Sequence, residues 1–247
     1  MKFLLAGEGS SDLGTNLLDG TLKKGAMTFL IDAISKRSCD TPLEYRLISE
    51  SELKSLKKAD RRNTMGRGIE HKPFEEIFLS AQYLGKHARG ESHDDEAVGV
   101  IFFRDCDGTN AAPVNLWEMI VKAMQAGFEE SGNKYGVPMV PRPKSEAWLL
   151  GYYQRNLPGQ REYNHCERFE DMPGNDHSPN ALKKLLKMAL HTDGDVYDQI
   201  DEDQINAIQW ERVDMRSLNL FRKRLENVLA AMTGSSYPYS IEETQLA

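Results

Sequence analysis

The sequence has few of the residues that mark disulfide-rich and zinc-binding proteins. Only three of its 247 residues are cysteine, they are widely spaced, and none of them forms a CxxC pair. The six histidines show no spacing typical of metal ligands. These absences argue against a disulfide framework and against structural zinc, and they favour a reducing cytoplasm.

Long apolar runs are also missing. No segment approaches the roughly 20 apolar residues that a membrane-spanning helix needs. The apolar stretch at residues 3–6 is too short for the hydrophobic part of a signal peptide, and Glu8 follows it closely. We therefore expect no membrane association. The apolar content of 40% and the charged content of 28% are those of an ordinary globular protein with a full core.

Acidic residues outnumber basic ones overall, but the basic residues are concentrated in one segment. The net charge is −7, which excludes a protein coated in positive charge. Residues 54–72 nevertheless hold seven Lys or Arg against two acids, whereas residues 193–203 are strongly acidic. A basic segment in an acidic chain is either a solvated face or a nucleic-acid contact. The candidate contacts in and beyond it are Lys57, Lys58, Arg61, Arg62, Arg67 and Arg142.

Apolar patterns predict alternating strands and helices over the first 155 residues. We predict strands at 2–6, 44–48, 97–103 and 137–140, and helices at 26–35, 73–87, 114–130 and 145–153. Helical patterns return at 181–191, 203–212 and 217–232, without a strand candidate. The alternation predicts an α/β fold with a mostly parallel sheet flanked by helices. We expect a catalytic domain at 1–155, with a basic insertion at 51–72, and a helical extension at 156–247 packed on it.

Acidic residues follow two of the predicted strands. Glu8 follows the first, in the segment Glu-Gly-Ser-Ser-Asp that ends at Asp12, and Asp105 and Asp107 follow the third. The carboxyl ends of parallel strands meet at one edge, where open α/β folds build their sites. Gathered carboxylates repel one another unless a cation joins them, and oxygen ligands suit Mg²⁺ or Mn²⁺. We predict that Glu8, Asp105, Asp107 and Glu146 hold such an ion.

These residue types suit phosphodiester chemistry. A divalent cation orients the phosphate and lowers the pKa of a bound water, as it does in polymerases and nucleases. Glu8 is the candidate general base, Asp105 and Asp107 are candidate metal ligands, and Lys144 is the candidate that neutralises charge on the phosphate. Metal-dependent phosphodiester chemistry on DNA or RNA is the function that these residues predict.

The order of these motifs resembles a known family. A first strand followed by Glu8, Gly9 and Asp12, and a later strand followed by Asp105 and Asp107, is similar to the Toprim domain of topoisomerases, primases and OLD-family nucleases. The segment MVPRPKSEAWLL, ending at Leu150, resembles a Toprim-like bacterial family found near ATPases and mobile elements. The resemblance covers about residues 1–150. It implies a Toprim-type nuclease in a bacterial defence or mobile-element system, with nucleic acid and an ATPase as partners.

Each residue also has a purely structural interpretation. Asp-x-Asp-Gly is good turn chemistry, so Asp105 and Asp107 are also candidates for capping a turn. Glu146 at a helix start is favoured by the helix dipole alone, with Ser145 expected as its N-cap. Asp12 is more typical of a turn or helix cap than of a metal ligand.

Two other functions fit the same sequence. The segment FFRDCDGT, which contains Asp105 and Asp107, matches the first motif of haloacid-dehalogenase-type phosphatases, in which the first aspartate is the nucleophile and the second a general acid/base. That alternative leaves Glu8 without a role. The other alternative is a non-catalytic Toprim-like module that binds a partner such as an ATPase.

Overall fold

The computed structural model describes residues 1–61, 74–92, 96–106, 115–157, 165–175, 177–178 and 181–234. Three of the predicted site residues, Arg62, Arg67 and Asp107, lie outside the described residues. The predictions for the side chains of Lys57, Lys58 and Arg61 likewise fall outside what the structure describes, although these residues belong to a helix.

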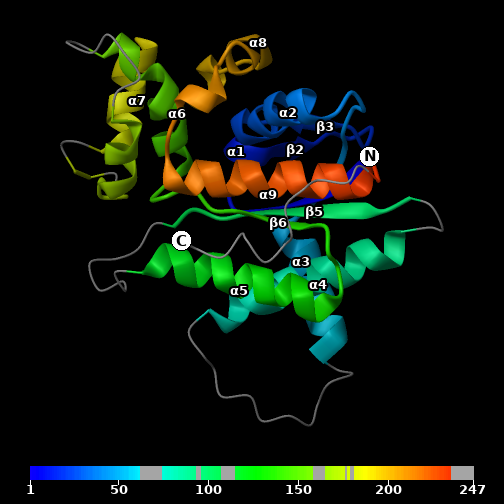
Figure 1. Cartoon of the computed structure of the whole chain (residues 1–247). Coiled ribbons are helices and arrows are strands. Elements are labelled where there is room, and N and C mark those ends of the chain that lie inside the picture. The colour runs from blue at the N-terminus through cyan, green and yellow to red at the C-terminus, as the bar shows by residue number, and fades with distance from the viewer. Residues whose placement is uncertain are drawn as a thin grey trace.

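A four-stranded parallel sheet forms the centre of the molecule (Figure 1). Its strands are β1 (Lys2–Gly7), β4 (Glu44–Ile48), β5 (Val98–Phe103) and β6 (Gly136–Met139), in the order β4-β1-β5-β6. The four strand predictions are correct to within one residue at each end. The predicted α/β fold with a mostly parallel sheet is confirmed.

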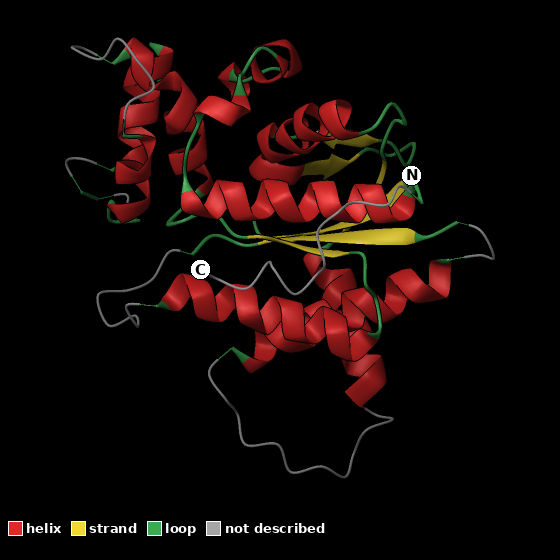
Figure 2. Ribbon diagram, in the orientation of Figure 1, coloured by secondary structure: helices red, strands yellow, loops and turns green. Residues whose placement is uncertain are grey.

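Helices cover both faces of the sheet (Figure 2). Successive residues of a strand point to opposite faces, so Leu4 and Ala6 pack with one set of helices, and Phe3 and Leu5 with the other. The first set is α3 (Glu50–Arg61), α4 (Glu75–Glu91) and α5 (Leu116–Ser131), and the second includes α1 (Ser10–Leu13), α2 (Ala26–Ser38) and α9 (Arg216–Met232).

The C-terminal helices belong to the same hydrophobic core as α2. They are α6 (Ser145–Tyr153), α7 (Leu182–Leu190), α8 (Glu202–Asn206) and α9, joined by 3₁₀ turns at Gln154–Asn156, Cys166–Asp171, Tyr197–Gln199 and Trp210–Arg212. Buried Trp148 of α6 donates its indole N–H to Ser217 Oγ at 2.7 Å. The Glu170 carboxylate accepts the backbone N–H groups of Arg216 and Ser217, at 2.8 and 2.7 Å, and so caps the start of α9.

Two sequence predictions are wrong. No strand is predicted between those at 2–6 and 44–48, but this part of the chain contains an antiparallel hairpin, β2 (Gly14–Asn16) and β3 (Leu22–Lys24). The helix expected at 203–212 ends at Asn206 and is followed by a 3₁₀ turn. Ile208 and Trp210 are both buried, and residues two apart do not share a helix face, so a helix continued through this segment could not bury both.

No helix within the described parts of the chain is both long enough and apolar enough to cross a bilayer.

We expect Gly127 to be essential to the contact between α4 and α5. A Cβ at this position would lie 2.3 Å from the backbone oxygen of Phe78, which cannot rotate away. Gly127→Ala should therefore lower the free energy of unfolding by about 2–3 kcal/mol. Gly90→Ala is the matched control, because Gly90 is also helical and a Cβ there meets nothing within 4 Å. That change should raise stability by up to about 1 kcal/mol. Urea unfolding measures both, and an equally stable Gly127→Ala variant would contradict the packing.

Candidate functional site

The order of the strands reverses between β1 and β5: the chain passes from β1 outward to one edge of the sheet and from β5 outward to the other. The connection from β1 to β4 runs over the face covered by α2, and the connection from β5 to β6 runs over the opposite face through α5. In open α/β sheets the crevice at such a point is the usual ligand site. Gly7 is paired with Phe103, so Glu8 and Arg104 follow directly at this edge.

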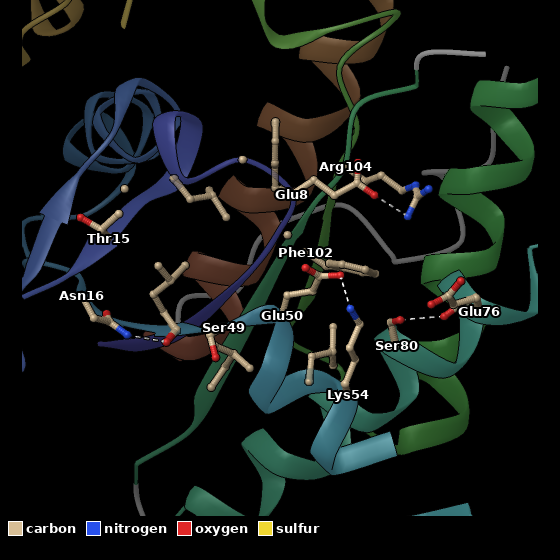
Figure 3. A pocket seen from close by; sticks show the side chains of 18 residues that line it. Glu8, Thr15, Asn16, Ser49, Glu50, Lys54, Glu76, Ser80, Phe102 and Arg104 are labelled. Atoms are coloured by element: carbon tan, nitrogen blue, oxygen red, sulfur yellow. Dashed lines mark hydrogen bonds and ion pairs between the residues drawn. The ribbon is translucent and has the colours of Figure 1, made fainter. Parts of the chain in front are cut away.

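Glu8 lies at the open side of the crevice. Its Oε1 is 2.8 Å from the Arg104 guanidinium Nη1, and the two side chains are 57% and 37% exposed. Both residues line a cavity of about 620 Å³ (Figure 3). An ion pair this exposed is only weakly held, since water screens it. Each of these two residues is therefore able to leave the ion pair and bind another charged partner.

Asp105 connects β5 to the start of α6. Its Oδ1 accepts the backbone N–H of Ser145 at 3.0 Å, in the first turn of the helix. The predicted N-cap role of Ser145 is wrong, because Lys144 occupies the cap position and Ser145 is the first helical residue. The carboxylate from the neighbouring strand end replaces the cap, and the positive end of the helix dipole stabilises it there.

Glu146 is buried at this same helix start. It is 5% exposed, and its Oε2 has no hydrogen-bond partner among the described residues. Burial raises the pKa of Glu146, and the charge of Asp12 raises it further, while its own backbone N–H, Lys144 and Lys183 oppose the shift. Asp12, on α1, is itself only 7% exposed. The negative charges of two buried acids repel each other, and a cation bound between them would offset this repulsion.

Tyr197 brings a hydroxyl from the C-terminal region to these acids. Its hydroxyl shares a hydrogen bond of 2.8 Å with Ser145 Oγ. Burial raises the pKa of Tyr197, and the charges of Glu146, Asp12 and, more weakly, Asp105 raise it as well. Sequence reasoning missed Tyr197, because it lies in the strongly acidic run at 193–203, whose composition gives no signal of a site. It also assigned Asp12 only a capping role, since its burial depends on packing remote in the sequence.

The predicted residues fall into two neighbouring groups within the described chain. Glu8 and Arg104 lie at the cavity, and Asp105, Glu146 and Lys144 lie at the start of α6 with Asp12 and Tyr197. The last predicted residue, Arg142, forms an ion pair of 3.1 Å with Asp171, with 35% of its side chain exposed.

The donor set is compatible with a hard divalent cation, although the described residues do not complete a site. No group of three or more His, Cys, Asp or Glu in the described ranges is arranged to hold a metal ion. Carboxylate oxygens are the ligands that Mg²⁺ and Mn²⁺ prefer, and Glu146 Oε2 is a buried oxygen that lacks a donor among the described residues. The predicted metal ligation thus stays a prediction, with Asp107 outside the described residues.

Comparison with known proteins identifies no relative. The chain matches no family model, no curated protein and no solved structure.

We expect Glu146→Gln to stabilise the metal-free protein, increasingly so as the pH rises. Below the ordinary carboxyl pKa of 4.5 the group is protonated in both states and contributes nothing. Above it the unfolded state ionises first, so stability is lost until the pH exceeds the raised pKa of the folded state. Urea unfolding in EDTA from pH 4 to pH 8 should show a gain for the variant that is absent at pH 4 and largest at pH 8.

The control for this measurement is Glu130→Gln, an exposed carboxylate on α5. This variant should not show a gain at pH 8 of the size expected for Glu146→Gln. A Glu146→Gln variant that is less stable than the wild type at pH 8 would show that the buried carboxylate is held by favourable interactions.

Proposed function

We propose that this protein is a divalent-metal-dependent nuclease of the Toprim type. The observation that carries the proposal is the position of Glu146: a buried carboxylate at the carboxyl edge of the sheet, next to Asp105, with one oxygen lacking a hydrogen-bond partner among the described residues. A buried, uncompensated acid costs stability, and such groups are typical of functional sites. The family resemblance of the sequence supports the same function.

Asp105 and Glu146, with Glu8 and Asp107 as the sequence predicts, would hold Mg²⁺ or Mn²⁺. Such an ion supplies a Lewis acid for the phosphate and a bound water of lowered pKa. Asp12 lies close enough to influence the charge of Glu146, so we add it to the candidate ligands.

The side chains of this protein then have separate tasks. Arg104 and Lys144 neutralise the non-bridging oxygens of the phosphodiester, which requires Arg104 to exchange Glu8 for the phosphate. Glu8, released from that pair, accepts a proton on a carboxylate oxygen from the attacking water. The Tyr197–Ser145 hydrogen bond holds the start of α6 in place, and with it Glu146.

Substrate approach needs positive charge around these acids. Arg142 and the basic segment with Lys57, Lys58, Arg61, Arg62 and Arg67 are the proposed contacts to the nucleic-acid backbone, and binding that depends on them weakens as salt rises. The resemblance further supports an ATPase partner and a role in bacterial defence or on a mobile element.

The nuclease proposal is tested with Asp105→Asn. The amide keeps an oxygen that can accept the Ser145 N–H, so the helix start is preserved while the charge is lost. With Mg²⁺ or Mn²⁺, the wild type should cleave plasmid, single-stranded DNA or tRNA, and the variant should be slower by at least about 100-fold. Asp40→Asn, at an exposed acid that precedes the amino end of β4, is the matched control and should cleave like the wild type.

Two results would contradict the proposal. Equal cleavage by Asp105→Asn would place the activity elsewhere. Absence of cleavage by the wild type, together with no stabilisation of the fold by Mn²⁺ in thermal unfolding, would favour the non-catalytic module, because an ion that binds only the folded state must raise its stability.

Glu8→Gln separates the nuclease from the phosphatase alternative. Glu8 has a role in proton transfer only in the first, so the variant should lose about 100-fold or more of phosphodiester cleavage. A haloacid-dehalogenase-type phosphatase would use Asp105 as nucleophile and would be nearly unaffected. Cleavage of a plasmid and hydrolysis of p-nitrophenyl phosphate, each measured on wild type and variant, distinguish the two. Retained phosphatase activity in Glu8→Gln would favour the alternative.

A further inference from the structure

The cavity beside Glu8 lies next to the carboxylate group but is separate from it. Its walls are the loop after β1, the start of the β2–β3 hairpin, and the first turns of α3 and α4 (Figure 3). Glu8 and Arg104 line it, whereas the described acids Asp12, Asp105 and Glu146 do not. The two adjoin at Gly9, which lines the cavity and lies beside Asp12.

Size and lining suit a small molecule. The volume of about 620 Å³ falls within the range of small-molecule sites. Apolar side chains, among them Leu47, Leu53 and Phe102, line the cavity together with polar groups. Figure 3 shows Phe102 between the Glu8–Arg104 pair and the Glu50–Lys54 pair. Phe102 is 5% exposed, so it contributes an apolar floor between the polar groups rather than an open ring face.

The charge of the cavity argues against a phosphate as its occupant. Lys54, one of the two cations in the described lining, is paired with Glu50 at 2.7 Å. Arg104, the other, is paired with Glu8 at 2.8 Å, and where it binds the substrate phosphate in the proposed mechanism it leaves Glu8 as an uncompensated acid of the lining. Glu76 adds a third acid to the lining. A site with this balance favours a neutral ligand that donates hydrogen bonds.

We propose that this cavity binds a nucleobase. The inference rests on the proposed nuclease function, in which Arg104, a residue of the cavity lining, binds the phosphodiester. The base lies against the apolar part of the lining and is read by the polar rim. Asn16 contributes an amide that is already oriented, because its Nδ2 donates to the Leu47 carbonyl at 3.0 Å.

The acidic rim selects among bases. The N1–H and N2–H₂ groups of guanine lie side by side and match the two oxygens of a carboxylate, and Glu50, with a side chain 78% exposed, is accessible for this contact. The other bases lack this pair of adjacent donors. We therefore expect guanine to bind best.

Binding is measured on Asp105→Asn, which prevents turnover. Isothermal titration with guanosine, adenosine, cytidine and uridine gives the base preference. The affinity of short single-stranded oligonucleotides is then compared between one that has guanine beside the scissile phosphate and one that has an abasic site there. This comparison tests whether the cavity binds a base that is part of a strand. Guanosine should bind most tightly, and adding Glu50→Gln or Asn16→Ala should weaken guanosine about tenfold, the scale of one base-specific pair of hydrogen bonds. Glu44→Gln, exposed on β4 and outside the cavity lining, is the control and should change nothing.

The outcomes distinguish a base of the substrate strand from a free nucleoside. They also distinguish failure of the base-binding proposal from failure of the nuclease proposal. Competition between guanosine and the strand, with loss of strand affinity at the abasic site, assigns the cavity to a base of the substrate. Guanosine binding without competition assigns it to a free nucleoside or nucleotide. Absence of any binding that responds to Glu50→Gln or Asn16→Ala overturns the inference, even where the wild type is a nuclease. Base binding by a protein without metal-dependent cleavage overturns the nuclease proposal alone.

Discussion

The hydrogen bond from the Ser145 backbone N–H to Asp105 is the constraint on which the rest of the site depends. It joins the end of the fully buried strand β5 to the start of α6, and so brings two segments forty residues apart to one edge of the sheet. Once this helix start is fixed, Glu146 must be buried at the same edge, and Ser145 Oγ is positioned to meet Tyr197. The dipole of α6 favours the negative charge of Asp105, which is why a carboxylate rather than a hydroxyl supplies this contact.

The acids at this edge are held against their electrostatic preference. Burial and the nearby charge of Asp12 both raise the pKa of Glu146, and the same charges raise the pKa of Tyr197. A fold that served only stability would place apolar residues there. The energetic cost is offset by the surrounding core, in which Trp148 and its neighbours on α6 are fully buried against α9. Strain of this kind concentrated at one edge is what the proposed metal site would relieve.

The crevice has two chemically different parts. One contains buried carboxylates suited to a cation, and the other is a cavity that contains the Glu8–Arg104 pair and suits a neutral ligand. Because the pair is exposed, its members can exchange partners as a substrate enters. In the proposed function one residue pair therefore coordinates the recognition of a phosphate with that of the adjacent base.

Local sequence determined the elements and the edge at which the acids gather. Buried strands such as β5 and amphipathic helices such as α5 have periodic apolar patterns, and the alternation of the two specifies a parallel sheet whose carboxyl ends carry Glu8 and Asp105. The partners of these acids were decided only by the tertiary structure. Asp12, Tyr197 and Arg104 are polar residues in short, aperiodic segments, and their contacts depend on packing between residues up to almost two hundred positions apart. The apolar periodicity of the sequence does not predict such contacts, since burial and electrostatic coupling arise only when the chain has folded.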